Sequence, residues 1–249
     1  MNFQKRKQKI FDALKTDGEA DIKKLAVELN MAEITIRRDL NQLAADGLLY
    51  RTHGGATKID PNEKPHAFVN KTAQNAVVKD EICRIAAAEI IDGDRIFMDC
   101  GSTVFRLCQF IKHKKIKVIT NSLPVVYELQ NSKVSINIIG GELDAERQAV
   151  HGSVAAEHIA RYRATKAFLG VDGISLNGLF ANSEKEASIT TAFIANSHFT
   201  YLLCDSAKIG KETYLNFAPL NKINAIITNG TADQLQGFGE QGVAVFNVK

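Results

Sequence analysis

Two adjacent arginines near the start of the chain have side chains suited to contact with nucleic acid. They stand in the run Thr35-Ile36-Arg37-Arg38-Asp39-Leu40. An arginine can donate two hydrogen bonds to the edge of guanine or hold a phosphate, and a threonine can contact a thymine methyl group or a phosphate. The run therefore predicts DNA contact, and the residue types leave open which arginine meets a base and which a phosphate.

The spacing around the arginines fits a helix that presents them outward. At about 100° per residue, Ile36, Leu40 and Leu43 fall on one stripe that can face a small core. Arg38 and Asn41 point the other way. Arginine pairs that bind nothing are common on exposed helices, so the neighbouring elements must decide between the two interpretations. The predicted contacts of this helix are Thr35, Arg37, Arg38 and Asn41.

The neighbouring segments favour a DNA-binding domain. We expect helices at 3–15, 22–29 and 33–46, followed by a wing made of strands 48–51 and 52–56. Asp21 is a plausible N-cap for the second helix, and Gly47 suits the end of the third. Arg51 and His53 on the wing, with Arg6 on the first helix, could contact the DNA backbone or minor groove.

Composition limits the remaining classes of function. The chain has 249 residues and a net charge of only +3, so nucleic-acid binding must be local. Its four cysteines are widely spaced and show no metal-binding pattern, which suits buried thiols in a reducing cytosol. No signal peptide or membrane span is apparent. We therefore expect a cytoplasmic protein with no metal site, no cofactor and no membrane partner.

The rest of the chain changes character after a predicted linker at 57–76, which contains Pro61 and Pro65. From residue 77, helical and apolar strand patterns alternate, which predicts an open α/β sheet over 77–249. The expected strands are 95–99, 117–120, 134–139, 166–170, 199–204, 225–228 and 243–247. The expected helices are 77–91, 103–111, 123–130, 153–162, 184–195 and 231–241.

Small and polar residues follow the first of these strands, where open α/β sheets bind ligands. Gly101, Ser102 and Thr103 begin a helix, so backbone N–H groups, the helix dipole and two hydroxyls could hold a phosphate. Asp99 could accept a hydrogen bond from a sugar hydroxyl. An ordinary helix cap with a tight turn would have the same sequence pattern.

Further loops at strand ends carry similar residues. Taken singly, each of these residues could be an ordinary loop residue or a surface charge. Together they predict a binding site for a polar ligand. His151 could also contact a ligand, although a lone histidine in a loop is more often structural. The remaining candidates are Thr120, Asn121, Ser122, Gly141, Asp172, Glu186 and Lys208.

Both parts of the chain resemble the DeoR (deoxyribose-operon repressor) family. Residues 1–56 resemble its winged helix-turn-helix domain through Arg6-x-x-x-Ile10, the run from Thr35 to Leu40, Gly47, and Arg51-Thr52-His53-Gly54-Gly55-Ala56. Residues 77–249 resemble its sensor domain through Asp99-x-Gly101-Ser102-Thr103, Thr120-Asn121-Ser122, Gly140-Gly141, Gly152, Gly170-x-Asp172-Gly173-Ile174, Gly178, Glu186-Ala187 and Asp205-x-x-Lys208-x-Gly210. Ala32 departs from the serine N-cap usual in the family, a loss of about 1 kcal/mol.

The resemblance implies a transcriptional regulator, most simply a repressor of a sugar-catabolism operon that binds double-stranded operator DNA. The sensor domain is similar to ribose-5-phosphate isomerase, which implies a Rossmann-like fold and a phosphorylated sugar effector. Its phosphate would lie on the 101–103 loop, and Asp172 and Glu186 would match the acid and base positions of the isomerase. A small DNA-binding module also implies a homo-oligomer, and the family suggests a dimer or tetramer.

Two alternatives belong to other classes. Asp172 and Glu186 would suit an isomerase with a DNA-binding appendage, but residues 174–181 lack the lysine that the isomerase carries there. Because proton transfer between sugar carbons needs an acid, a base and help for the oxyanion, we expect no catalytic residues and no enzyme activity. A nucleotide-binding module is disfavoured because neither Gly-x-Gly-x-x-Gly nor a Walker lysine is present.

Overall fold

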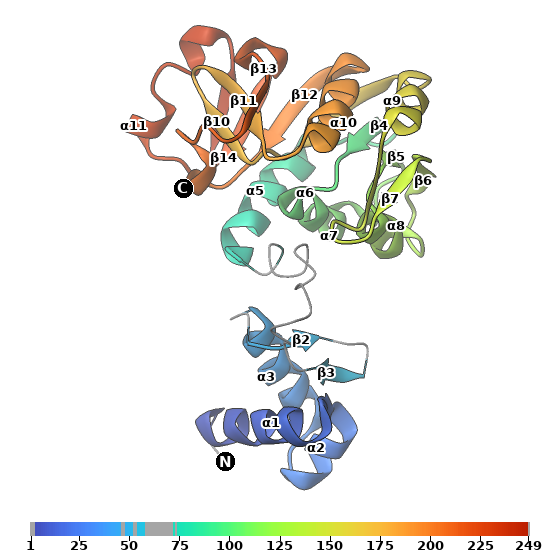
Figure 1. The fold of residues 1–249 in the computed structure, drawn as a ribbon, viewed down its shortest axis with the longest axis vertical. Coiled ribbons are helices and arrows are strands. Elements are labelled where there is room, and N and C mark those ends of the chain that lie inside the picture. Colours follow the sequence, from blue (N-terminus) through green and yellow to red (C-terminus); the bar gives the residue numbers. More distant parts are fainter. Residues whose placement is uncertain (1–2, 46–47, 52–53, 58–71, 73, 249) are drawn as a thin grey trace. The chain divides into compact units, whose positions relative to one another are not determined.

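The computed structural model describes residues 3–45, 48–51, 54–57, 72 and 74–248, which form two units (Figure 1). The units are Met1–Ala76 and Val77–Lys249. Most of the predicted linker at 57–76 lies outside the described residues, as do Gly47, Thr52 and His53.

Three helices of the smaller unit pack around one apolar core. They are α1 (Phe3–Asp17), α2 (Ile22–Glu28) and α3 (Glu33–Ala45). The predicted stripe of Ile36, Leu40 and Leu43 is confirmed, because all three side chains are fully buried against α1 and α2. The predicted N-cap is also confirmed, since the Asp21 carboxylate accepts a 2.9 Å hydrogen bond from the Lys24 backbone N–H. The residues that point away from the stripe are left for solvent or a partner.

The wing has three strands where the sequence predicted two. They are β1 (Glu19–Asp21), β2 (Tyr50–Arg51) and β3 (Gly55–Thr57), in the antiparallel order β1-β3-β2. Gly55 lies opposite Asp21, and a Cβ there would come 2.0 Å from the carbonyl oxygen of Ala20. Gly55 is therefore needed for the close approach of β1 and β3.

The larger unit contains the predicted parallel sheet. Its seven strands lie in the order β15-β14-β12-β9-β4-β5-β6, and every neighbouring pair is parallel (Figure 1). They are β4 (Arg95–Met98), β5 (Lys117–Thr120), β6 (Ser135–Ile138), β9 (Ala164–Leu169), β12 (Ser197–Leu203), β14 (Ala225–Thr228) and β15 (Ala244–Asn247).

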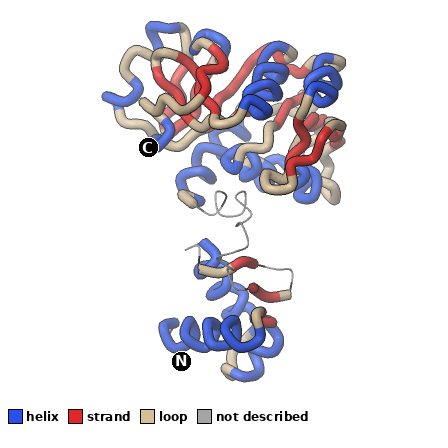
Figure 2. Tube along the Cα trace, viewed as in Figure 1, coloured by secondary structure: helices blue, strands red, loops and turns tan. Residues whose placement is uncertain are grey.

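Helices cover both faces of this sheet (Figure 2). Successive residues of β4 point to opposite faces, so Ile96 and Met98 enter one core and Phe97 enters the other. The first core also contains side chains of α5 (Ala76–Ala88), α6 (Ser102–Arg106), α7 (Cys108–Ile111) and α8 (Leu123–Leu129). The second contains side chains of α9 (Ser153–Ala160) and α10 (Glu184–Ala195). A sheet buried on both faces explains why its strands are apolar throughout.

Three parts of this unit differ from the sequence prediction. A hairpin of β7 (Glu142–Asp144) and β8 (Ala149–His151), and a small sheet of β10 (Gly173–Ser175), β11 (Gly178–Ala181) and β13 (Leu215–Ala218), occupy segments without predicted strands. Strands β7, β8 and β10 have only three residues each, too few for an alternating pattern to reveal them. The single helix predicted at 231–241 is wrong. The structure has α11 (Ala232–Leu235) and a 3-10 turn at Gly239–Gln241, separated by Gly237 with a φ of +86°.

None of the helices in the described residues combines the length and apolar character that crossing a bilayer requires.

Candidate DNA-binding and ligand-binding sites

Helix α3 presents the predicted DNA-contacting side chains on its outer face. Arg37, Arg38 and Asn41 are exposed, and Thr35 is half-buried. One guanidinium nitrogen of Arg37 lies 3.4 Å from a Glu33 carboxylate oxygen, one turn earlier on the same helix. An exposed pair of this kind is weak, so it leaves Arg37 able to exchange Glu33 for a phosphate. The outer face of α3 therefore has the residues and the access that a major-groove contact needs.

Arg6 has a structural partner in addition to its predicted DNA contact. Its guanidinium forms two hydrogen bonds to the carboxylate of Asp39 on α3, one of them 2.9 Å long between Nη2 and Oδ1. Both side chains are mostly buried. Because this ion pair joins α1 to α3, it holds the outer face of α3 in a fixed orientation. The geometry thus favours a positioning role for Arg6.

A groove runs beside this ion pair between α1 and the first turns of α3. Thr35 and Arg38 line it together with the largely exposed Ile34. The remaining lining residues are Phe3, Arg6, Asp39 and Gln42. On the wing, Arg51 lies in β2, but the structure does not describe its side chain, and His53 lies outside the described residues.

The sheet order brings the predicted ligand loops together. Strands β12, β9, β4 and β5 are consecutive neighbours, so the loops that follow them lie at one edge of the sheet. Those loops carry Asp205 to Lys208, Gly170 to Gly173, Asp99 to Thr103, and Thr120 to Ser122.

Asp99 joins two of these loops. Its Oδ1 accepts a 2.7 Å hydrogen bond from the Gly101 backbone N–H, and its Oδ2 accepts one of 2.6 Å from Gly170. Burial raises the pKa of the Asp99 carboxyl to about 6, the two backbone N–H groups oppose the rise, and the carboxylate of Asp172 adds to it. Asp99 thus holds the two loops together, and because it is only 5% exposed, its carboxyl is barely accessible to a sugar hydroxyl.

The loop at the start of α6 has a cation that the sequence prediction missed. Lys79 on α5 is only 5% exposed, and its ammonium nitrogen lies 3.2 Å from the Ser102 hydroxyl. Thr103 is buried beside it, and Gly101 at the N-cap places no side chain over the helix start. One feature of the sequence could have revealed Lys79, because it shares a helical stripe with the buried residues Ile82, Cys83 and Ala86.

Local structure uses most polar groups of the β5 loop. The Thr120 hydroxyl accepts a bond from the Ser122 N–H, and the Ser122 hydroxyl caps α8 at Val125. The Asn121 side-chain amide donates to the Val150 carbonyl at 3.0 Å. The buried Asn121 Oδ1, however, has no hydrogen-bond partner among the described residues. Of this loop, Asn121 has the polar atom best placed to meet a ligand.

The other candidates fall into two groups. Gly141 has a packing role, because a Cβ there would come 2.7 Å from the His151 carbonyl oxygen. Asp172 accepts a 2.9 Å bond from the Asn182 N–H, and Glu186 pairs with Arg147. Lys208 is half-buried at the end of the 3-10 helix Ser206–Lys208. Asp172, Glu186 and Lys208 thus belong to this edge of the sheet.

The described residues contain no group of three or more His, Cys, Asp or Glu side chains that could hold a metal ion. The polar groups at the loops include hydroxyls, carboxylates and ammonium groups, which can donate and accept hydrogen bonds.

A DNA-binding unit joined to an α/β unit with polar strand-end loops defines a transcriptional regulator with a sensor domain. The DeoR-like helix-turn-helix domain matches residues 6–62, and the DeoR C terminal sensor domain matches residues 74–230. The chain belongs to the DeoR family of transcriptional regulators.

Relatives are similar over nearly the whole chain. The lactose phosphotransferase system repressor of Lactococcus lactis subsp. lactis is 38% identical over 236 residues, which cover 92% of each chain. The HTH-type transcriptional repressor GlcR of Bacillus subtilis (strain 168) is 29% identical over 90% of this chain and 88% of that protein. A ribose 5-phosphate isomerase A structure from Methanocaldococcus jannaschii is 14% identical, with a TM-score of 0.40 over 54% of this chain and 55% of that one. A likeness that low carries no functional argument.

Proposed function

We propose that this regulator represses a sugar-catabolism operon and that a phosphorylated sugar bound to its sensor domain controls the repression. The names of the two relatives support a repressor, and one of them refers to a phosphotransferase system for lactose. The observation that carries the effector proposal is the contact between the buried Lys79 ammonium and the Ser102 hydroxyl. A buried ammonium beside hydroxyls and a helix start is a suitable place for a phosphate.

The residues divide between the two ends of such a ligand. The phosphate would accept hydrogen bonds from the backbone N–H groups and hydroxyls of Ser102 and Thr103 and from Lys79. The hydroxyls of the sugar would lie toward Asn121, Asp172, Glu186 and Lys208. Ligand binding can change operator affinity only if the ligand binds the DNA-bound and free arrangements of the regulator with different affinities.

The proposed partners follow from the size of the DNA-binding unit. One winged helix covers a short stretch of DNA, so two recognition helices on one operator would require a homo-oligomer. We infer binding without turnover, because residues 174–181 contain no lysine that could assist proton transfer. Operator DNA places the working protein in the cytoplasm.

A DNA-binding assay tests the proposal. DNA recovered by the protein from a random-sequence pool would be titrated with and without a panel of pentose and hexose phosphates. One phosphorylated sugar should change DNA affinity at least about tenfold, while its unphosphorylated form should not. The double variant Ser102→Ala with Thr103→Ala should lose this response but keep DNA binding. No response of the wild-type protein to any phosphorylated sugar would contradict the proposed effector class.

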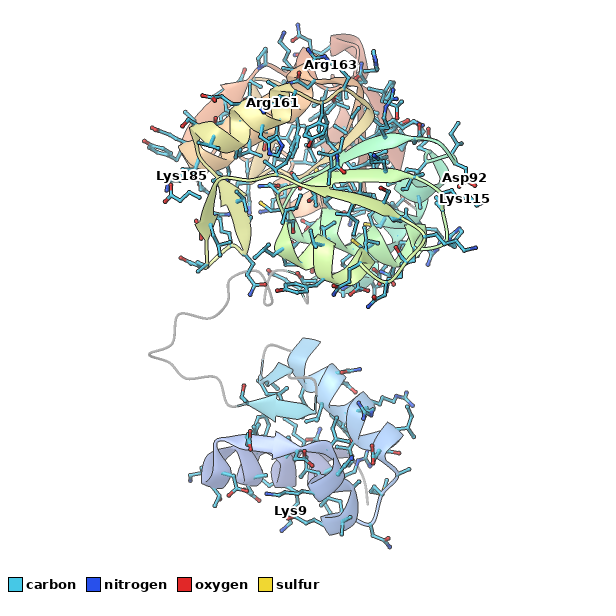
Figure 3. The ribbon with its side chains drawn as sticks, turned by 90° about the vertical axis from the view of Figure 1, so that its right-hand side faces the viewer. Lys9, Asp92, Lys115, Arg161, Arg163 and Lys185 are labelled. Carbon is cyan, nitrogen blue, oxygen red and sulfur yellow. The ribbon has the colours of Figure 1, made fainter. Side chains whose placement is uncertain are left out.

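The DNA-binding half is tested in the same assay. Arg38→Ala should weaken binding to the selected DNA at least about tenfold, because an arginine contact with a base or a phosphate is lost. The matched control is Arg161→Ala, which removes an exposed arginine at the end of α9 (Figure 3). Unchanged affinity of Arg38→Ala would contradict the groove assignment.

A further inference from the structure

The β7–β8 hairpin carries an arginine into the cluster of ligand loops. Two contacts join the hairpin to the start of α10, where Arg147 pairs with Glu186 and Glu142 lies 3.1 Å from Lys185, which is labelled in Figure 3. Its other side is joined to the β5 loop, because the Val150 N–H donates to the Asn121 carbonyl at 2.8 Å. The turn of the hairpin is therefore held between two of the segments that carry predicted ligand residues.

Arg147 also lies close to the loop that begins at Asp99. Burial raises the pKa of the Cys100 thiol, the carboxylates of Asp99 and Glu186 add to the rise, and the guanidinium of Arg147 opposes it. The same thiol is in contact with the Asn121 side chain. The thiol next to Asp99 thus contacts Asn121 and lies within electrostatic reach of Arg147 and Glu186, and these three residues come from different segments.

Two buried groups beside Arg147 have hydrogen-bonding capacity to spare. The Asn121 Oδ1 has no partner in the described part of the chain, and neither ring nitrogen of His151 meets hydrogen-bond geometry there. His151 is 1% exposed and lies near the backbone of Lys185 and the charges of Asp144 and Arg147. Buried polar atoms are nearly always paired, so the Asn121 Oδ1 points to a missing partner such as a ligand, whereas the His151 ring already interacts with the Lys185 backbone.

The charges explain why an arginine is needed at this end of the cluster. Asp99, Asp172 and Glu186 place three carboxyl groups at one sheet edge, which would repel an anionic ligand. Lys79 offsets this beside Ser102, and Arg147 offsets it at Glu186. An arginine paired with a carboxylate also presents donors and an acceptor side by side, the pattern that neighbouring sugar hydroxyls require.

We propose that Arg147, together with its partner Glu186, recognises the hydroxyls of the bound sugar and so determines which phosphorylated sugar the sensor accepts. The proposal rests on the proposed function, because it deepens the role of the same loop cluster. Arg147 would donate to one hydroxyl oxygen while Glu186 accepts from the next. The spare acceptor of Asn121 and the ring of His151 would complete the contacts.

Binding of two probes to the full chain tests this role. Calorimetric titration would compare inorganic phosphate with the hexose or pentose phosphate that gives the largest thermal shift on the wild-type protein. Arg147→Ala should weaken binding of the sugar phosphate at least about tenfold, because a charged hydrogen bond is lost. Its affinity for inorganic phosphate should stay within about twofold of the wild-type value. Arg147→Lys keeps the positive charge but loses the forked pair of donors. Its affinity for the sugar phosphate should lie between those of the wild type and Arg147→Ala.

Matched variants separate this role from a change in folding. Arg161→Ala should bind both probes as the wild type does. Arg161 ends α9 and precedes the start of β9, whereas the ligand loops follow the ends of the strands. The double variant Ser102→Ala with Thr103→Ala should bind both probes more weakly than the wild type does. Wild-type affinity of Arg147→Ala for the sugar phosphate, or equal losses for both probes, would overturn the assignment of Arg147 and leave the proposed function standing. Absence of binding by the wild-type protein to every probe would instead overturn the proposed function itself.

Discussion

At the scale of single residues, Asp99 connects loop structure to the protonation of the sensor. Its carboxyl accepts backbone hydrogen bonds from Gly101 and Gly170, and burial together with Asp172 raises its pKa to about 6. The same carboxyl in an unfolded chain would titrate near 3.8. As the pH rises between these values, the unfolded carboxyl ionises first, so Asp99 lowers the free energy of unfolding until both states are ionised.

The pH dependence of Asp99→Asn tests this account. The free energy of unfolding of the wild type, relative to Asp99→Asn, should fall by on the order of 2–3 kcal/mol between pH 4 and pH 6.5, because two pKa units correspond to about that energy. Urea unfolding of both proteins across this range would measure the difference. A difference that stays constant with pH would contradict a raised pKa.

Asp94 provides a control of opposite sign. Burial acts to raise the pKa of Asp94, but its hydrogen bonds to Lys166, Ile91 and Thr165 lower it below the usual value. Its contribution to stability is therefore present at neutral pH and is lost as the pH falls through the folded-state pKa. The wild type should accordingly gain stability relative to Asp94→Asn as the pH rises.

At the scale of elements, two features hold the recognition helix α3 without a side-chain N-cap. The Ala32 carbonyl accepts bonds from the N–H groups of Thr35 and Ile36, while no serine is present to pair with the free N–H groups of the first turn. Burial of Ile36 and Leu40 and the ion pair of Arg6 with Asp39 hold the helix instead. The orientation of the DNA-contacting face thus depends on contacts between elements.

The wing offers a matched pair of glycine variants at the same scale. Gly55→Ala should force β1 and β3 apart, because its Cβ would meet the Ala20 carbonyl at 2.0 Å, while the Cβ of Gly54→Ala would meet only an Asp21 oxygen at 3.9 Å. We expect Gly55→Ala to destabilise the smaller unit by roughly 1–3 kcal/mol and to weaken DNA binding. Thermal unfolding and gel shift would compare the two, and equal behaviour would contradict the proposed role of Gly55.

At the scale of the whole molecule, the chain separates DNA contact from ligand contact. The described residues of Met1–Ala76 have their own apolar core, and those of Val77–Lys249 have two cores on the faces of one sheet. Each unit can therefore keep its fold while the other changes state. If the chain forms the proposed homo-oligomer, the proposed ligand can change operator affinity by changing the spacing of two DNA-binding units.

The dependence on two half-sites tests this arrangement. The full chain should bind selected DNA that contains two half-sites roughly 100-fold or more tightly than the same DNA with one half scrambled, because the second contact becomes intramolecular. A phosphorylated sugar that acts through the spacing of the two units should change this ratio. Fluorescence anisotropy would measure both affinities. Equal binding to the two DNAs would show that a single unit is sufficient and would remove the need for an oligomer.

Long periodic segments were predictable, whereas short ones were not. The stripe of Ile36, Leu40 and Leu43 and the helix Glu184–Ala195 follow from local periodicity, and the strand Lys117–Thr120 follows from its apolar residues. Strands of three residues, such as β7, β8 and β10, carry too few positions for either signal and form only because other segments pair with them. The same limit applies to the candidate site, whose loops were predicted but whose internal contacts were not.

The amino-acid sequence by itself determined the two-part organisation, the outward arginines of the recognition helix and the polar loops at strand ends, because each depends on neighbours within a few residues. Only the tertiary structure decided that Arg6 pairs with Asp39, that Lys79 meets Ser102, and that Arg147 reaches Glu186. Each of these pairs joins residues more than twenty positions apart along the chain. Such contacts form when separate elements pack together, and local periodicity contains no information about which distant side chains will meet.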